Sequence, residues 1–399
     1  MQISVLASTK EQPCFDMLDM ERFSGKMAAI CYMKDKYFGT AVSDDDKAVS
    51  RFDRVIKTGH HSISDHFFYT VLIENCSKFT AMLLNAMIRF YNTSEKSGRY
   101  TVMTREHPIY DKWLSIFIQE IHKYDPTLDD KLVEKLALEN ARYVLNMFAP
   151  YTTMAYTTSA RCWAYIYELL EEYLLSQYGK YLSDFDMQVY EEIEQLMTGI
   201  RDSGIVNDKI HIRPFKKIDF LASQTGYPIR NAKEYVGESY LINYKCSIVE
   251  LSQLVRHRTL DFYLDFDGKD GIEFYIPHII RGTEYASQWI DDLRKLMSDD
   301  RSYFPNAIIM SVWEAGTIAN KMMQCDERLC SRVQKATFDV VKETVERFIN
   351  VDYVLSDYCK YELSRHVDLE TGEIKMKCAN QKCLEPCHWG PIKGKEKLV

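Results

Sequence analysis

The chain has 399 residues, of which 46% are hydrophobic and 27% are charged, and this composition is typical of a globular protein with more than one domain. The formal net charge of −8 disfavours a general nucleic-acid-binding protein. The first residues contain no basic segment followed by a long apolar run, and no later run reaches transmembrane length. The eleven cysteines are mostly isolated, as in a reducing compartment, so we expect a cytoplasmic protein that binds neither membranes nor nucleic acid.

Hydrophobic periodicity predicts an α+β chain. In chain order it predicts a strand at 3–8, a helix at 45–58, a strand at 66–74, a helix at 77–90, a polar loop at 91–100 and long amphipathic helices at about 110–147 and 160–200. The stretch 202–217 mixes Gly, Asn, Pro and charged residues, which is typical of a linker between domains.

Short segments of the first half recur after this linker. Ile218–Ser223 resembles Ile3–Ser8, and Tyr240–Ser247 resembles Val71–Ser77, each of the latter two running into an apolar helix. We interpret these repeats as a fused duplication whose second copy has lost segments, since a solenoid would need at least three repeats. The predicted domains are a first copy at 1–205, a shortened second copy at 206–355 and a Cys/His-rich tail at 356–399.

The apolar residues after Cys246 recur at three- and four-residue steps and predict a helix over 246–258. This helix ends in Arg256-His257-Arg258, with Gln253 one turn before. Two guanidiniums, an imidazole and an amide form a cluster of donors that suits an anionic ligand such as a phosphate or a reduced flavin. The plainer interpretation is a solvated basic helix end that the helix dipole favours.

The tail contains grouped thiols and an imidazole, at Cys378, Cys383, Cys387 and His388. Thiolate and imidazole are zinc ligands, and a structural zinc ion would stabilise a small segment that has no core of its own. The spacing differs from that of the common zinc ribbons, so a reduced tail without metal is the other interpretation. We expect no metal elsewhere in the chain.

Three short motifs carry a family resemblance. They read G-H-x-S-x-x-D-H at 59–66, E-x-S-G-R-Y at 95–100 and S-Q-L-V-R-H-R at 252–258. The first resembles the G-H-x-[ST]-x-x-E-H segment of the flavin-dependent thymidylate synthases, the ThyX family, with Asp65 in place of Glu. The other two resemble that family's E-x-S-G-R-Y loop and its S-H-Q-L-V-R-H-R helix.

The R-H-R and serine motifs are continuous in that family but are separated here. The first copy keeps the serine loop and has Ala86-Met87-Ile88 where R-H-R is expected, whereas the second copy keeps R-H-R and lacks the serine loop. Family members are tetramers with sites between subunits, so the resemblance implies complementary halves and a homodimer of this chain. It also implies that each copy has a small, mostly antiparallel sheet with long helices, and that the copies form an intrachain pseudo-dimer.

The resemblance implies a role for each matched residue. The nucleotide would be bound by Ser97, Gly98, Arg99, Gln253 and Arg256. FAD would be bound by His60, Ser62, Glu95, His257 and Arg258. The catalytic residues would be Arg256, His257 and Arg258, because cations beside a flavin stabilise its anionic reduced form.

The implied reaction is the reductive methylation of dUMP at C5, with carbon from methylenetetrahydrofolate and reducing equivalents from NADPH through FAD. The family's base-contacting arginine aligns with Gln324 in the second copy and Leu170 in the first, and Arg161, Arg328 and Arg332 are candidates to replace it. Glutamine cannot reproduce the planar, bidentate donors of arginine. The alternatives are therefore a related flavoenzyme that modifies another pyrimidine nucleotide, or a non-catalytic relative that binds flavin or nucleotide.

Overall fold

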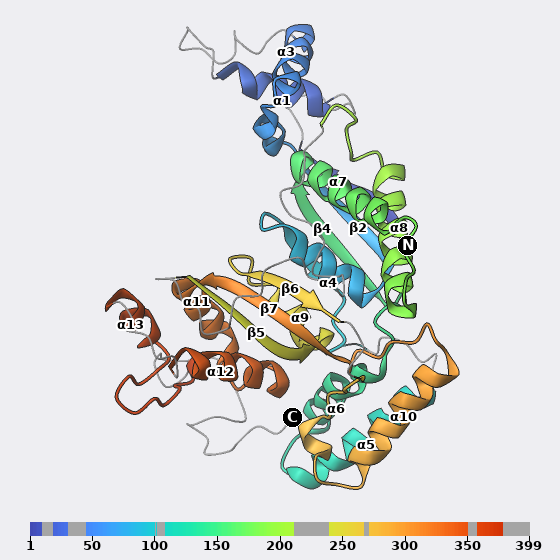
Figure 1. The fold of residues 1–399 in the computed structure, drawn as a ribbon, viewed down its shortest axis with the longest axis vertical. Helices are drawn as coiled ribbons and strands as arrows, with labels where there is room; N and C mark the ends of the chain where they lie inside the picture. The colour runs from blue at the N-terminus through green and yellow to red at the C-terminus, as the bar shows by residue number, and fades with distance from the viewer. Residues whose placement is uncertain are drawn as a thin grey trace. The chain divides into compact units, whose positions relative to one another are not determined.

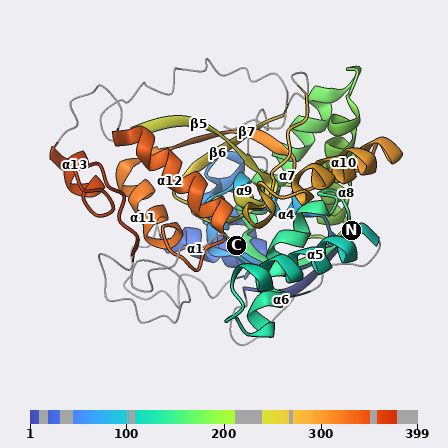
Figure 2. The same ribbon diagram turned by 90° about the horizontal axis from the view of Figure 1, so that it is seen from below.

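The computed structural model describes residues 1–9, 19–30, 45–99, 101, 108–210, 239–266, 271–349 and 357–377. They form helices and two small antiparallel sheets, which confirms the predicted α+β class (Figure 1, Figure 2). The chain divides into two compact units: unit 1 is Met1–Lys96 with Pro150–Ile218, and unit 2 is Ser97–Ala149 with Asp219–Val399. The two units are defined by the contacts between residues. They do not test the predicted boundaries of the two sequence copies, which stay a prediction.

Unit 1 contains a four-stranded antiparallel sheet in the order β1-β2-β4-β3. Its strands are β1 (Gln2–Ser8), β2 (Phe68–Cys76), β3 (Asn92–Glu95) and β4 (Thr152–Ser159). Met154 and Tyr156 of β4 are buried and Ala155 between them is partly exposed, so one face of the sheet carries the core. Tyr156 donates to the Leu84 carbonyl of α4 and packs against Trp163 of α7, so helices cover this face (Figure 1). These helices are α4 (Lys78–Met87), α7 (Ala160–Gln177) and α8 (Asp184–Asp202).

A helical pair forms the rest of the described part of unit 1. It consists of α1 (Asp19–Ile30) and α3 (Asp45–Lys57), followed by the short 3-10 helix η1 (His61–His66). Phe52 is fully buried in the core of this pair. Gly25 allows the close approach of the two helices, because a Cβ atom there would lie 1.9 Å from the Ala48 carbonyl oxygen.

Unit 2 contains a three-stranded antiparallel sheet in the order β5-β7-β6. Its strands are β5 (Ser239–Ser247), β6 (Asp261–Asp265) and β7 (Ile309–Thr317). Tyr244, Leu264 and Val312 lie on its buried face. The helices that pack against the sheet are α9 (Ile248–Leu254), α11 (Ile318–Arg328) and α12 (Lys335–Ile349).

A helical layer completes unit 2. Its elements are α5 (Pro108–Tyr124), α6 (Asp130–Ala141), the 3-10 helices η2 (Arg142–Val144) and η4 (His278–Ile280), and α10 (Tyr285–Asp299). Helices α5 and α6 lie side by side (Figure 1, Figure 2). The rings of Trp113 and Trp289 pack edge to face at 4.7 Å and join α5 to α10. The first part of the predicted tail forms α13 (Asp357–Leu363) and packs on α11, where His366 bonds to Asp326 at 2.8 Å.

The two sheets share one strand order, since β2, β4 and β3 correspond to β5, β7 and β6. In each sheet the first of these strands leads through a capping serine, Ser77 or Ser247, into a helix. The central strand leads through a capping hydroxyl, Ser159 or Thr317, into a second helix. Two sheets of this kind fit two copies. The repeat at 218–223 lies outside the described residues.

Several element boundaries differ from the prediction. The segments 110–147 and 160–200 each contain two helices, because Asp129 caps α6 and Gly179, with φ +75°, follows α7. The strand at 152–159 was missed, since its apolar residues run on into α7 without a break in hydrophobicity. Within the part of the chain that the structure describes, no helix combines the length and apolarity needed to cross a membrane.

Candidate functional site

The R-H-R residues lie in a turn directly after α9, not on the helix as predicted. Ser247 caps α9 by accepting from Val249 N at 3.1 Å, and the Glu250 carboxylate accepts from Ser247 N at 2.7 Å. The helix ends at Leu254, and His257 N then donates to the Leu254 carbonyl at 2.9 Å. Arg256 and Arg258 are exposed, whereas His257 is partly buried. The predicted cluster of donors is therefore presented by a turn.

The serine loop is held by contacts within unit 2. The backbone N–H of Arg99 donates to Ser97 Oγ at 3.3 Å. The Arg99 guanidinium pairs with the buried carboxylate of Glu139 on α6 at 2.8 Å, and its Nη2 donates to the Arg332 carbonyl at 3.2 Å. Arg99 is thus fixed between two segments that are far from it in sequence.

Arg328 of α11 bonds to the helix that precedes the R-H-R turn. Its Nη2 donates to the Gln253 carbonyl at 2.8 Å. Burial is the main cause that lowers the pKa of Arg328 to about 10, and the nearby positive charges of Arg256 and Arg99 contribute to this shift. The predicted nucleotide ligands from the two motifs therefore lie around one buried guanidinium.

Donors at this position have unused hydrogen-bonding capacity. The Nε atoms of Arg142 and Arg328 are buried and have no hydrogen-bond partner among the described residues. Burial lowers the pKa of Arg142. Buried donors are normally satisfied, so these atoms suit a ligand rich in acceptors, such as a phosphate or the pyrimidine edge of a flavin.

His257 is neutral at physiological pH. Burial lowers its pKa to about 3, and the charges of Arg328 and Lys321 act in the same direction. Its Nε2 is buried without a hydrogen-bond partner among the described residues. The positive charge of the R-H-R turn is therefore carried by the two arginines, while His257 offers a neutral ring.

We expect His257 to destabilise the folded chain in mild acid. Below its unfolded pKa of 6.5, the unfolded chain takes up a proton that the folded chain excludes until about pH 3. The free energy of unfolding is therefore not reduced by His257 well above pH 6.5. It decreases as the pH is lowered, by about 1.4 kcal/mol at about pH 5.5. Urea unfolding at about pH 7 and about pH 5.5 measures the loss, which should be smaller in His257→Gln. Equal losses in both proteins would refute the assignment.

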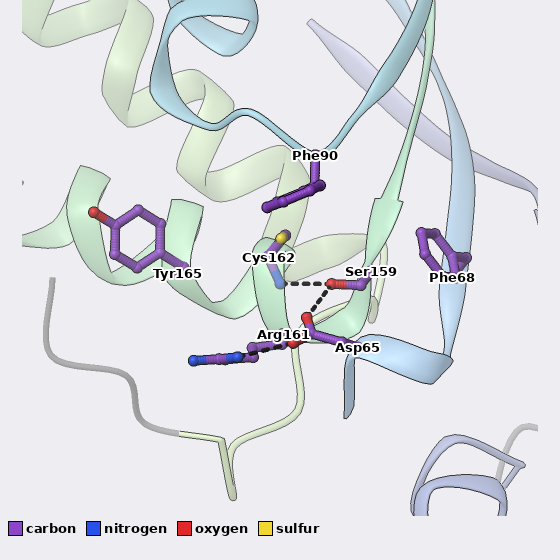
Figure 3. Close-up of a pocket in the computed structure, with 7 residues that line it drawn as sticks. All are labelled: Asp65, Phe68, Phe90, Ser159, Arg161, Cys162 and Tyr165. Carbon is purple, nitrogen blue, oxygen red and sulfur yellow. Dashed lines mark hydrogen bonds and ion pairs between the residues drawn. The ribbon is translucent and has the colours of Figure 1, made fainter. Parts of the chain in front are cut away.

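A cavity of about 430 Å³ lies beside the predicted histidine segment of unit 1 (Figure 3). Asp65 accepts from Ser159 Oγ at 2.8 Å and pairs with Arg161 at 2.8 Å. Ser159 also caps α7 by accepting from Cys162 N at 3.2 Å, so the polar side of the cavity is fixed by the start of that helix. Its full lining is Asp65, Phe68, Phe90, Ser159, Arg161, Cys162 and Tyr165.

Asp65 and Arg161 are residues that the motifs and the family resemblance single out, whereas the aromatic lining of this cavity was not predicted. Phe68 is 44% exposed and Phe90 is 81% exposed, which is unusual for such large apolar side chains. Their positions at the start of β2 and after α4 gave no periodic signal. Only the fold brings them to the N-terminus of α7.

The predicted flavin ligands of unit 1 are not part of this cavity's lining. His60 precedes η1 and Ser62 lies within it, and both residues are exposed. Glu95 lies at the end of β3, where its almost fully buried carboxylate accepts from Lys78 Nζ at 2.6 Å. The roles of these three residues stay predictions.

Arg328, rather than Gln324, occupies the helix position that corresponds to Leu170. The helices α7 and α11 begin after the capping residues Ser159 and Thr317, and 170 − 159 and 328 − 317 both equal 11. The predicted alignment with Gln324 is therefore displaced by about one helical turn. Gln324 itself is fully buried, and its side-chain oxygen accepts from a neighbouring lysine of α11.

The predicted zinc ligands Cys378, Cys383, Cys387 and His388 lie outside the described residues. Among the residues that are described, no group of three or more His, Cys, Asp and Glu side chains is arranged to hold a metal ion. A zinc ion in the tail stays a prediction.

Two arginines, Arg99 and Arg328, therefore donate hydrogen bonds to backbone carbonyls near the turn between α9 and β6 of unit 2. The family profile described as thymidylate synthase complementing protein, Thy1, matches residues 15–198. This segment includes the motifs at 59–66 and 95–100, so the match agrees with the predicted resemblance to the ThyX family. No curated protein sequence matches the chain.

Three solved structures are similar to parts of the chain. ThyX from Helicobacter pylori complexed with FAD and dUMP has 17% identity and a TM-score of 0.30, over 51% of this chain and 93% of that chain. A second structure of the Helicobacter pylori protein with FAD and dUMP has 18% identity and a TM-score of 0.29, over 53% and 99%. The UMP/dUMP methylase PolB from Streptomyces cacaoi, bound with 5-Br dUMP, has 16% identity and a TM-score of 0.30, over 50% and 90%.

Proposed function

We propose that the chain is a flavin-dependent thymidylate synthase-like enzyme, which methylates dUMP at C5 using methylenetetrahydrofolate and NADPH. The observation that carries this proposal is that both motifs contact the segment 328–332: Arg328 Nη2 donates to the Gln253 carbonyl, and Arg99 Nη2 donates to the Arg332 carbonyl. Arg99 and Arg332 lie 233 positions apart and are joined by a hydrogen bond at this site. The family match over residues 15–198 supports the same assignment.

The nucleotide phosphate would lie between Ser97, Arg99 and Arg256. A hydroxyl, a backbone amide at Gly98 and two guanidiniums offer the donors that a phosphate dianion requires. Arg328 would contact the base, because its Nε lacks a partner among the described residues and its helix position corresponds to that of the family's base-contacting arginine. A base-reading arginine favours a uracil nucleotide over the alternative substrates.

The residues of the turn also fit FAD. His257 and Arg258 follow Arg256 directly, and the buried Nε2 of His257 without a partner among the described residues suits a polar ring edge. When bound, FAD carries reducing equivalents from NADPH to the transferred carbon. The arginines would stabilise negative charge on the ligand, while His257 keeps its neutral ring at physiological pH.

The aromatic cavity of unit 1 supports a flat ligand as well. Phe68, Phe90 and Tyr165 line it, and the Asp65–Arg161 pair supplies its polar side (Figure 3). A flavin or adenine ring suits such walls. We propose that this cavity, beside the histidine segment, takes part in cofactor binding.

We further propose that the enzyme acts in the cytoplasm as a homodimer. The chain would then present two ThyX-like copies per subunit, and two chains would resemble the family's tetramer. Analytical ultracentrifugation tests the assembly, because a dimer has twice the mass of the 46.8 kDa chain. A monomer at working concentration would contradict this part of the proposal.

The reaction is tested by incubating the purified protein anaerobically with FAD, dUMP, methylenetetrahydrofolate and NADPH. Formation of dTMP that depends on all four compounds is the expected result. Flavin and dUMP binding without dTMP would favour an enzyme for another pyrimidine nucleotide or a non-catalytic relative. Absence of both flavin and nucleotide binding would contradict the proposal.

A further inference from the structure

Gln334, directly before α12, is a buried amide that joins several elements of unit 2. It is 2% exposed. Its Oε1 accepts from Arg142 Nη2 and from Gln253 Nε2, the latter at 3.0 Å. Its Nε2 donates to the Tyr143 hydroxyl at 3.0 Å and to the Glu139 carbonyl at 3.3 Å. The amide of Gln334 therefore makes all the hydrogen bonds that it can, and each partner lies 81 residues or more away in the sequence.

The chemistry of its partners fixes the orientation of this amide. A guanidinium can only donate, so Arg142 must face the oxygen of Gln334. A backbone carbonyl can only accept, so Glu139 must face its nitrogen. The orientation of Gln334 is thus determined by two independent contacts.

Gln334 in turn determines the orientation of Gln253. Because Gln334 presents its oxygen, Gln253 must present its Nε2, and this nitrogen also faces the Val249 carbonyl at 3.5 Å. The Oε1 atom of Gln253 has no hydrogen-bond partner among the described residues. Gln253 is partly exposed, so its side-chain carbonyl oxygen is the group that can accept a hydrogen bond from a ligand.

The remaining members of the network complete it without conflict. The Tyr143 hydroxyl accepts from Gln334 and donates to the Glu250 carboxylate. Burial raises the pKa of Tyr143 well above its usual value, so the hydroxyl keeps its proton. Glu250 also accepts from Ser247 N at the start of α9, the helix that carries Gln253. The network therefore holds both the helix and its terminal amide.

We propose that Gln334 is a positioning residue, which fixes Gln253 as a hydrogen-bond acceptor for a donor group of the nucleotide. In a uracil deoxynucleotide these donors are the 3′-hydroxyl of the sugar and the N3–H of the base. A carbonyl oxygen repels phosphate oxygens, so Gln253 contacts the nucleoside part rather than the phosphate. This inference rests on the proposed function and corrects the predicted place of Gln253 in the site.

The test compares the binding of dUMP, dCMP and 2′,3′-dideoxyuridine monophosphate to the full chain with FAD, by isothermal titration calorimetry. The analogue that lacks the relevant donor is expected to bind about 10-fold more weakly than dUMP. A weaker dCMP identifies N3–H, and a weaker dideoxy analogue identifies the hydroxyl. Gln334→Met, which keeps the side-chain length, should reduce this discrimination to within about 2-fold.

Gln334→Glu is the matched control. Its carboxylate still accepts from Arg142 and Gln253, so the discrimination should remain, although both variants lose the bond to Tyr143 and melt at lower temperature. A merely structural role predicts the same discrimination in both variants. If Gln334→Met does not fold, Gln253→Met, at a partly exposed position, should lose the discrimination instead.

Full discrimination in the folded Met variant of either position overturns the inference. Equal binding of dUMP and both analogues by the native protein also overturns it, while the proposed function stands. Failure of the native protein to bind dUMP overturns the proposed function and, with it, this role of Gln334.

Discussion

Arg256→Ala and Arg99→Ala are each expected to weaken dUMP binding about 100-fold, since each removes charge-assisted hydrogen bonds to the phosphate. Arg99 belongs to the first predicted copy and Arg256 to the second. Arg99 bonds to the Arg332 carbonyl, and Arg328, four residues earlier, bonds to the Gln253 carbonyl three residues before Arg256. Loss of binding in both variants is the result that a single composite site requires.

Calorimetric titration of dUMP into each variant measures this effect. Arg294→Ala is a matched control, because Arg294 is an exposed arginine on α10 of the same unit. We expect the control to bind dUMP as the native protein does. Melting temperatures separate loss of binding from loss of fold, which matters for Arg99 because it neutralises the buried Glu139. Native affinity in either Arg256→Ala or Arg99→Ala would exclude the composite site.

Lys321→Met is expected to destabilise the protein by about 3–5 kcal/mol. Lys321 and Glu314 are fully buried, and their charged atoms are 2.8 Å apart. The Glu314 carboxylate also accepts from Tyr240 at 2.5 Å and from Tyr244 at 2.9 Å. Removal of the ammonium leaves a buried carboxylate with two neutral donors, which cannot balance its charge. Because α11 also carries Arg328, nucleotide binding should weaken as well.

Lys295→Met is the control for this substitution. Lys295 and Asp299 form an exposed pair on α10 at 2.7 Å, with side chains 72% and 58% exposed. Solvent screens such a pair, so we expect a loss below about 1 kcal/mol. Urea unfolding at neutral pH compares the two variants. Similar losses in both would mean that Lys321 and Glu314 are not a buried charge pair.

The sequence contains the serine loop and the R-H-R motif, but it does not show how they are arranged around Arg328. The apolar steps after Cys246 correctly predicted a helix, because periodicity is a local property. The change from helix to turn after Leu254 was missed, since the apolar pattern continues through Val255. The resemblance to the family, rather than periodicity, connected this turn with the Ser97 loop.

Other parts of the site depend on tertiary structure. Gln334 lies in a segment without a motif, and its role follows only from contacts with residues of α6, η2 and α9. Arg328 is one of three candidate arginines in the sequence, and its place in α11 is counted from the capping residue Thr317. Phe68 and Phe90 converge on one cavity from separate elements. No periodic pattern in a single sequence encodes such contacts.

The central claim is that the serine loop and the R-H-R turn form one site for flavin and nucleotide. Its most direct test is the absorption spectrum of the purified chain with added FAD, followed by titration with dUMP. We predict a retained flavin whose spectrum changes on saturation with dUMP, and no such change in Arg256→Ala. A protein that retains no flavin, or whose flavin responds to dUMP equally in both forms, would contradict the claim.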